Sequence, residues 1–428
     1  MIVQHSPAVG VELSSVHCAL SVVYSTSGPS GPSSEASSAP PPTNDPLTQA
    51  YDLSSRAGAD HFLVSFQRSP LAWQVVDQLL SNPVPPAVDP SAAGAAAASW
   101  APSPSSGPHA RAFFAAMTLH SKIRDDMYQL PAASLPSLRA SLLQHAGRYA
   151  SAGGAEARPT VTRLLLATSA LAVQMQWDGL VEDALSGDPG RPGGGLEPLG
   201  KLELFKLAPE EANSPRLYLQ NEQDRFVFNQ NLSQAAPQVL DFILHSATSS
   251  PSDQALQEQC LSCLQMWIRY IPIPSSVWVS HPIIFEHVFT RALPSPALFE
   301  AATDVLVEIL RSYESEHRAN AALVQKMIPA VMSLDPAFRA ALAAEDEDSV
   351  RAYCRIFTEM AESYMSLLMD AQDLGQVELV RLVLRCAAVP EQDAACITMN
   401  FWYRFVDSLE TLEPYEFRQM KIDYFQPQ

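Results

Sequence analysis

The sequence lacks the features of a membrane or secreted protein. No run of eighteen or more uncharged apolar residues occurs, so no membrane-spanning helix is expected. The N-terminus has no basic region of the kind that begins a secretory signal. Six cysteines in 428 residues are too few for a disulfide framework, and reduced cysteines behave as small apolar side chains. A reducing location, the nucleus and the cytoplasm, is therefore expected.

Charged residues are also few, at 17% of the chain, and acidic ones outnumber basic ones by 46 to 27. The resulting net charge of -19 repels phosphate backbones and favours basic partners. We therefore expect no direct nucleic-acid binding. Hydrophobic residues make up 47%, which is typical of a folded chain with a large core.

Motifs for catalysis, metals and cofactors are incomplete or missing. Gly195–Lys201 fits the first seven positions of a phosphate-binding loop, but Leu202 replaces the required hydroxyl, and Pro198 removes an N–H donor. Cys260 and Cys263 have the spacing of half a zinc site, yet no second Cys or His pair follows. We expect core packing for this pair, no cofactor, no metal and no catalytic residue. The chain is predicted not to be an enzyme.

The acidic run Glu345–Asp348 has two interpretations. It is either a patch for a basic partner or the first turn of a helix starting near Ser349, where acidic side chains complement the helix dipole. We favour the second interpretation.

Apolar residues recur at helical spacing almost everywhere, and no convincing strand-type alternation occurs. Three stripes illustrate this pattern: Val161, Leu164, Leu165, Thr168, Leu171, Ala172 and Met175; Leu256, Cys260, Cys263, Leu264, Trp267 and Ile271; and Tyr353, Ile356, Phe357, Met360, Tyr364, Leu367 and Leu368. The pattern predicts an all-α protein.

Turns containing Pro, Gly or Ser separate the predicted helices, and helix pairs recur at roughly 35–50 residues, as in HEAT or armadillo repeats. Phe113–Met117 and Phe401–Val406 are apolar on several sides, which favours helices packed on two neighbours. The predicted fold is a HEAT/armadillo-type right-handed superhelical solenoid over residues 46–428. Residues 1–45, rich in Ser and Pro, are predicted to be disordered, and residues 82–108 to form a low-complexity loop.

Five collinear segments resemble importin-β-type nuclear transport receptors of the transportin-SR branch. They are Phe66–Leu80 (FQRSPLAWQVVDQLL), Phe113–Arg124 (FFAAMTLHSKIR) with Met127–Pro131 (MYQLP), Ser137–Leu143 (SLRASLL), Tyr353–Glu359 (YCRIFTE) and Asn400–Arg404 (NFWYR). The resemblance marks residues of about 46–150 as similar to the importin-β N-terminal region. Two departures are the loop at 82–108 and a chain end near the middle of a full receptor, so we expect a truncated form, the N-terminal half.

The resemblance implies import of protein cargo through nuclear pores under the control of the Ran GTPase. It implies Ran in its GTP form, nucleoporins and basic Arg/Ser-rich cargo as partners, with cargo held weakly because the family holds it chiefly through the missing half. In the family, second helices of the first repeats meet Ran, and the matching stretches are Trp73–Leu80 and Phe113–Arg124. The Ran-contacting residues implied are therefore Trp73, Asp77, Phe114, Thr118 and Lys122.

Two alternatives stay open. Lys122 is either a partner-binding residue or a solvated lysine at a helix end. The whole chain is either a transport receptor or a generic HEAT-repeat scaffold for protein–protein interaction, which would not distinguish the nucleotide states of Ran.

Overall fold

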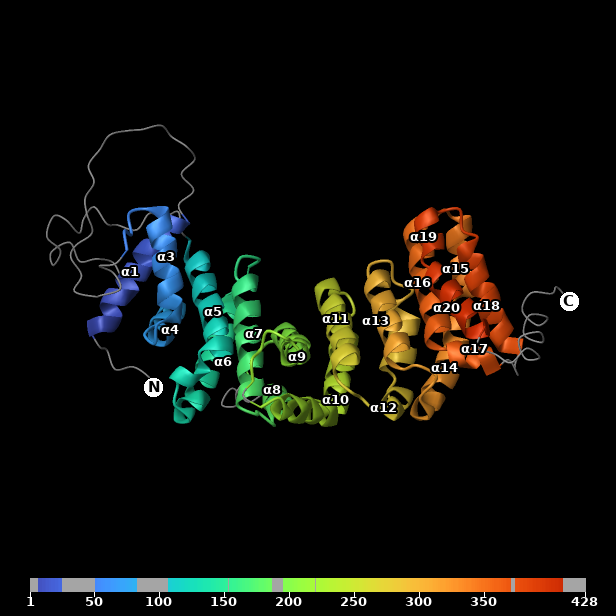
Figure 1. Ribbon diagram of the computed structural model, residues 1–428, viewed down its shortest axis with the longest axis horizontal. Helices are drawn as coiled ribbons and strands as arrows, with labels where there is room; N and C mark the ends of the chain where they lie inside the picture. Colours follow the sequence, from blue (N-terminus) through green and yellow to red (C-terminus); the bar gives the residue numbers. More distant parts are fainter. Residues whose placement is uncertain are drawn as a thin grey trace, which may run out of the picture. The chain divides into compact units, whose positions relative to one another are not determined.

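A computed structural model describes residues 7–24, 51–82, 107–152, 154–186, 195–219, 221–370 and 374–410. All regular structure in these segments is helical, which confirms the predicted all-α class. The chain divides into two compact units, residues 1–228 and 229–428, and each is described separately. Within each unit, neighbouring helices pack side by side (Figure 1).

The first unit is built from helical hairpins. Its elements are α1 (Pro7–Val23), α3 (Arg56–Arg68), α4 (Ala72–Ser81), α5 (Pro108–Asp125), η2 (Met127–Gln129), η3 (Ala132–Ser134), α6 (Leu135–Ala152), α7 (Arg158–Gln174), α8 (Leu180–Leu185) and α9 (Pro198–Ala212). Helices α1 and α3, α4 and α5, and α6 and α7 pair as hairpins. The first helices α1, α4 and α6 contact one another in one layer, and α3, α5, α7 and α9 form a second layer. This stacking of similar pairs is the organisation of a solenoid.

The second unit repeats this arrangement. Helix α10 (Gln223–Ser249) contains the boundary between the units, and the elements after it are α11 (Gln254–Tyr270), α12 (Ser275–Ser280), η4 (Ile283–Ala292), α13 (Phe299–Ser312), η5 (Arg318–Asn320), α14 (Ala321–Met332), α15 (Asp335–Ala343), α16 (Glu347–Ser363), α17 (Met365–Asp370), α18 (Leu374–Ala387), α19 (Gln392–Cys396) and α20 (Met399–Glu410). Helices α11, α13, α16 and α20 contact in succession and form the second layer of this unit.

Local sequence explains where several helices begin. The side chains of Ser55, Asp253 and Asp346 accept hydrogen bonds from backbone N–H groups in the first turns of α3, α11 and α16. Such caps satisfy donors that have no partner inside the helix. Gly58 allows the close approach that the first of these turns requires, because a Cβ there would lie 2.1 Å from the Asp52 carbonyl oxygen.

The helix η4 is unusual because it is a π-helix over ten residues. Its wider turn is visible in the bond from the Leu293 N–H to the Val288 carbonyl, which are five residues apart. Ile283, Ile284 and Val288 are nevertheless fully buried. A π-helix of this length is rare, and such segments are frequent at functional sites.

The three predicted apolar stripes lie in the core. All six residues of the α11 stripe are buried, and so are most of those on α7 and α16. The exceptions are Val161, Met175 and Leu367, which are half-buried. A solenoid thus buries the side of each helix that the sequence period selects.

The predicted disorder of residues 1–45 is wrong for residues 7–24. These residues form α1, whose Val16, Ala19 and Leu20 are fully buried and which packs against α3 and α4. The solenoid therefore begins before residue 46. Residues 25–45 and most of the predicted loop at 82–108 lie outside the described residues.

The expectation that Phe401–Val406 packs on several sides is also wrong in part. Phe401 and Phe405 are buried, but Tyr403 and Val406 are exposed, at 75% and 52%. Phe113–Met117 follows the expectation more closely, because Phe114, Ala115 and Ala116 are buried while Phe113 and Met117 are half-buried.

Candidate partner-binding site

The five residues implied by the resemblance lie on one hairpin. Trp73 and Asp77 lie on α4, whereas Phe114, Thr118 and Lys122 follow one another at four-residue spacing on α5. Four residues is close to one helical turn, so the three α5 side chains share a face. That face packs into the hairpin, because Phe114, Thr118 and Lys122 are all buried.

Lys122 is the polar centre of this hairpin. Its ammonium donates hydrogen bonds to the Gln67 carbonyl at 3.2 Å, to Asp126 Oδ2 at 2.9 Å and to Gln129 Oε1 at 2.9 Å. Burial lowers the pKa of this lysine, and the bond to Asp126 opposes the shift. Only 1% of the residue is exposed. The interpretation of Lys122 as a solvated lysine is therefore wrong.

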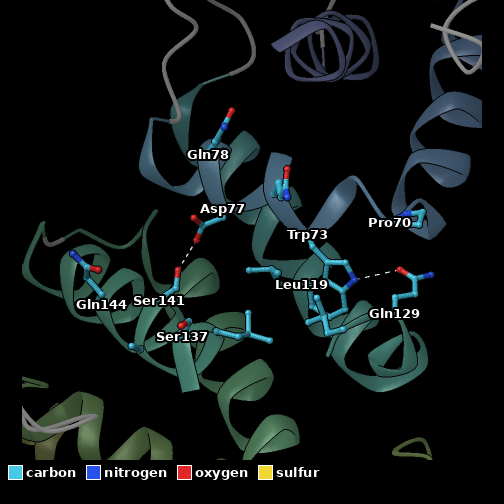
Figure 2. Close-up of a pocket in the computed structure, with 13 residues that line it drawn as sticks. Pro70, Trp73, Asp77, Gln78, Leu119, Gln129, Ser137, Ser141 and Gln144 are labelled. Carbon is cyan, nitrogen blue, oxygen red and sulfur yellow. Dashed lines mark hydrogen bonds between the residues drawn. The ribbon is translucent and has the colours of Figure 1, made fainter. Parts of the chain in front are cut away.

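Trp73 closes the same network from the side of α4. Its indole N–H donates to Gln129 Oε1 at 3.2 Å (Figure 2). The Lys122 ammonium lies 5.2 Å from the centre of the Trp73 ring. The amide of Gln129 in turn donates to the Arg68 carbonyl. Thr118 accepts a hydrogen bond from Gln67 at 3.0 Å and donates to the Phe114 carbonyl. These contacts tie α3, α4, α5 and η2 together.

Asp77 is the accessible member of the five, with 42% of its side chain exposed. It borders a cavity of about 510 Å³ between α4 and α6, with Leu119 of α5 at its base (Figure 2). The polar side chains of Gln74, Gln78 and Gln144 line the same cavity.

Asp77, Ser141 and His145 come together in a way that resembles a hydrolase triad but differs from it. Asp77 Oδ1 accepts hydrogen bonds both from Ser141 Oγ and from His145 Nε2, the latter at 3.0 Å. Burial alone would raise the pKa of Asp77, but the bonds from His145 and Ser141 lower it. In a triad the histidine must bond to the serine to take its proton. Here both groups bond to the carboxylate, so the serine is not activated.

The layer to which α4 belongs differs from the expectation. The resemblance implied that Trp73–Leu80 and Phe113–Arg124 are both second helices of their hairpins. In the structure α4 is the first helix of its hairpin and contacts α1 and α6, whereas α5 lies in the second layer with α3 and α7. Only α5 therefore occupies the layer that the resemblance connects with Ran.

The other motifs are structural. Gly195–Lys201 leads into α9, which begins at Pro198, and Leu202 is buried. Cys260 and Cys263 are buried on α11. Burial raises the pKa of the Cys260 thiol to about 12, as expected for an inert core cysteine. Glu347 and Asp348 lie in the first turn of α16, which begins two residues before Ser349 and agrees with the favoured interpretation of the acidic run.

Among the residues that the structure describes, no group of three or more His, Cys, Asp or Glu side chains is placed to hold a metal ion. The described helices also include none long and apolar enough to cross a bilayer.

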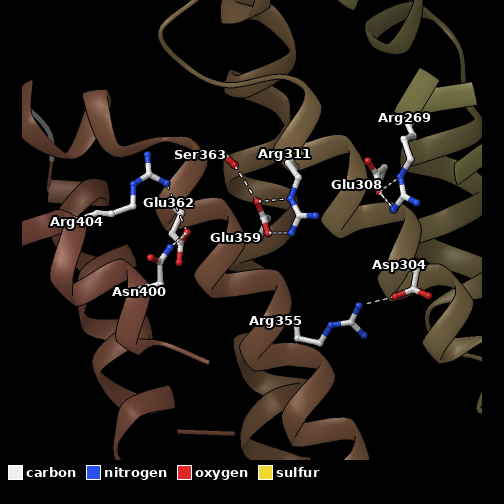
Figure 3. A network of polar contacts seen from close by, with 10 residues as sticks. All are labelled: Arg269, Asp304, Glu308, Arg311, Arg355, Glu359, Glu362, Ser363, Asn400 and Arg404. Atoms are coloured by element: carbon white, nitrogen blue, oxygen red, sulfur yellow. Dashed lines mark hydrogen bonds and ion pairs between the residues drawn. The ribbon is translucent and has the colours of Figure 1, made fainter. Parts of the chain in front are cut away.

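Sequence reasoning missed a polar network on the second layer of the second unit. Figure 3 shows arginine–carboxylate contacts that run across α11, α13, α16 and α20. A signal for it exists in the sequence, because Arg355, Glu359 and Glu362 recur at three- and four-residue spacing on α16, which is otherwise mostly apolar on its buried side.

Two family models match parts of the chain. The model for the Transportin-3/Importin-13 second TPR domain matches residues 345–427, and the model for Exportin 1-like protein matches residues 160–306. The similarity is to the importin-β family. Neither match covers half of the chain.

Curated relatives give the same result. Transportin MOS14 of Arabidopsis thaliana is 28% identical over 376 residues, which is 85% of this chain and 35% of the relative. Importin-13 of Homo sapiens is 23% identical over 384 residues, or 86% of this chain and 36% of the relative. The chain thus spans about a third of the length of these relatives. They carry the names of transport receptors, in agreement with the prediction that the chain is not an enzyme.

A solved structure of importin-13 in its cytosolic state shares the fold. It superposes with a TM-score of 0.55 at 18% identity, covering 72% of this chain and 35% of that one. The predicted HEAT-type solenoid is thereby confirmed.

Proposed function

We propose that this chain acts as a nuclear import receptor of the transportin-SR type, carrying protein cargo through nuclear pores under the control of Ran-GTP. The observation that carries this proposal is the similarity to a transportin over 85% of the chain. The helical hairpins and the importin-13 fold support it. Shuttling between nucleus and cytoplasm and contact with nucleoporins are parts of the same proposal.

The second layer of the first unit is the surface we assign to Ran. On α5 the buried residues Phe114, Thr118 and Lys122 hold the hairpin in shape, and the exposed Ser121 and Asp125 are available for contact. On α3 the exposed Asp60 and Val64 extend this surface. Trp73 and Lys122 thus act as positioning residues. Asp77 faces the cavity between α4 and α6, in the layer of first helices.

A comparison of the two nucleotide states of Ran tests this function. Purified chain is immobilised and incubated with Ran loaded with GTP or with GDP, and we expect retention of the GTP form only. The double variant Asp60→Lys/Asp125→Lys reverses two exposed charges and is expected to weaken that retention. The control Glu316→Lys reverses one exposed charge in the turn after α13, outside this surface, and is expected to have little effect.

Equal retention of the two Ran states would instead support a generic HEAT-repeat scaffold. Basic Arg/Ser-rich cargo is expected to bind weakly, because solenoid surfaces are built by adding repeats and this chain spans about a third of its relatives. A phosphorylated and an unphosphorylated Arg/Ser peptide, measured in parallel, would show whether this part of the array holds cargo at all.

A further inference from the structure

Three arginine–carboxylate contacts of the second unit join an exposed arginine to a more buried carboxylate. The side chain of Arg269 is 40% exposed, whereas that of its partner Glu308 is 7% exposed. The side chain of Arg311 is 58% exposed, whereas that of its partner Glu359 is 16% exposed. Arg404 is likewise half exposed, above a largely buried Glu362. In each of these three pairs the guanidinium group is therefore the more accessible partner. At these three positions an approaching partner meets arginine before the carboxylate, in spite of the acidic net charge of the chain.

The hydrogen bonds to Glu308 and Glu359 use only one edge of each guanidinium, although Arg269 also interacts with Tyr270. Arg269 uses Nε and Nη2 for Glu308, and Arg311 uses Nε and Nη2 for Glu359. An arginine has five N–H donors in a planar fork, so a group bonded through the Nε–Nη2 edge still presents N–H donors on Nη1. That remaining edge matches a second carboxylate or a phosphate.

Both arginines border one hollow of about 370 Å³ between α11, α13 and α16. Thr358 lines the same hollow, and its Oγ1 is buried without a hydrogen-bond partner. Because that oxygen is itself buried, an anion in the hollow would contact the arginines rather than the Thr358 hydroxyl.

We infer that the arginine row Arg269–Arg311–Arg404 is a docking surface for an extended acidic segment of a protein partner. Adjacent helices lie about 8–10 Å apart and an extended chain advances about 3.3 Å per residue, so acidic side chains about three positions apart fit Arg269 and Arg311 on the neighbouring helices α11 and α13. Helix α16 lies between α13 and α20, so Arg404 fits an acidic side chain about six positions farther along the segment. A basic segment fits less well, because it would have to displace an arginine and leave that charge without its partner.

Arg355 lies beside this row and plays a different part. It donates Nη1 to Glu300 and Nη2 to Asp304, which are themselves more exposed than it is. Asp304 lines the hollow and repels an acidic ligand there. Removing its charge should therefore strengthen binding of an acidic segment and weaken binding of a basic one.

The test uses the full chain and a fluorescein-labelled peptide with Glu at every third position. Two further peptides carry phosphoserine or Lys at the same positions, and a single-stranded oligonucleotide of matching length is the fourth ligand. Fluorescence anisotropy at about 50 and about 300 mM NaCl gives the affinities and their dependence on salt. We expect the Glu and phosphoserine peptides to bind, with an affinity that falls at high salt, and the Lys peptide not to bind. The ratio of the first two affinities shows which acidic group the surface prefers.

Variants locate the site. Arg269→Gln and Arg311→Gln are each expected to weaken acidic peptide binding about tenfold, the value of one charge-assisted contact. Arg339→Gln removes an exposed, ion-paired arginine on α15 that does not border the hollow, and should leave binding unchanged. Asp304→Asn should tighten it.

A single Arg→Gln change leaves a buried carboxylate without its partner, so the single variants could fold poorly. In that case two double variants, which neutralise both partners of a pair, replace them: Arg269→Gln/Glu308→Gln and Arg311→Gln/Glu359→Gln. Tighter binding of the Lys peptide, equal effects of Arg311→Gln and Arg339→Gln, or oligonucleotide binding as tight as that of the peptide would each overturn the inference. The inference does not depend on Ran, so its failure and that of the proposed function are distinguishable.

Discussion

The Lys122 ammonium lies 5.2 Å from the centre of the Trp73 ring, and both side chains bond to Gln129 Oε1. A cation over an indole face is attracted to it, more strongly when water is excluded. This pair therefore joins α4 to α5 at the point where the chain turns into η2.

Replacing Lys122 by Met should destabilise the first unit. The change removes three hydrogen bonds and leaves Asp126 without its ion-pair partner, at a cost of about 2–4 kcal/mol in the free energy of unfolding. Chemical denaturation followed by circular dichroism measures it. Arg68→Met, at an exposed position on α3, is the matched control and should change little. A Lys122→Met protein as stable as the parent chain would contradict this structural role.

Acid should loosen the packing of α1 through His17. Burial, reinforced by Arg111, lowers the pKa of His17 from 6.5 to about 4. The unfolded chain therefore binds a proton first as the pH falls, so the stability that His17 contributes is full above about pH 6.5 and is lost toward pH 4. At pH 5 the loss is about 2 kcal/mol. Hydrogen exchange of the α1 amides at pH 7 and pH 5, compared at equal intrinsic rates, measures this.

His17→Gln removes the titrating group and should make that pH dependence shallower, whereas His61→Gln, at an exposed position, should not. The same pH dependence in all three proteins would assign the effect to other groups.

Replacing Trp267 by Ala should cost about 3–5 kcal/mol, through lost burial and the cavity left behind. Trp267 is fully buried on α11, which packs on α13. In a solenoid the effect falls mainly on neighbouring repeats, so hydrogen exchange should accelerate in the helices next to α11 and much less in α3–α6. A uniform loss of protection from end to end would contradict this picture.

Ser141 should be unreactive toward fluorophosphonate probes, which label activated serines. Both Ser141 and His145 bond to Asp77, so the histidine is not placed to take the serine proton. Mass spectrometry after labelling checks this, with a serine hydrolase as positive control. Labelling at Ser141 would show that this serine is activated and would contradict the expectation that the chain has no catalytic residue.

The period of apolar residues was enough to predict the helices and most of the core. It selected Trp267, Cys260 and Leu264 on α11 correctly, because a solenoid buries the same side of each helix that the sequence marks. It failed for α1 because the Ser/Pro tract that follows dominated the composition of residues 1–45, although Val16, Ala19 and Leu20 have helical spacing.

The position of a polar side chain was harder to predict than that of an apolar one. Lys122 ends in a buried network because a carbonyl of α3 and an amide of η2 reach it, and these come from segments about 55 and 7 residues away in the chain. Likewise, the assignment of α4 to the first layer depends on its packing against α1 and α6. Neither relationship can be inferred from the spacing of residues along a single helix.

The π-helix η4 also has a consequence for the repeat in which it lies. A ten-residue π-helix is equivalent to an α-helix that has absorbed extra residues without losing its buried side, which still carries Ile283, Ile284 and Val288. Deleting one residue would favour a return to α geometry, in which each residue turns the helix by about 100°. An insertion or a deletion in this segment is therefore tolerated only while the wide π-turn absorbs the change. Otherwise it would rotate the buried face of this helix relative to the neighbouring helices.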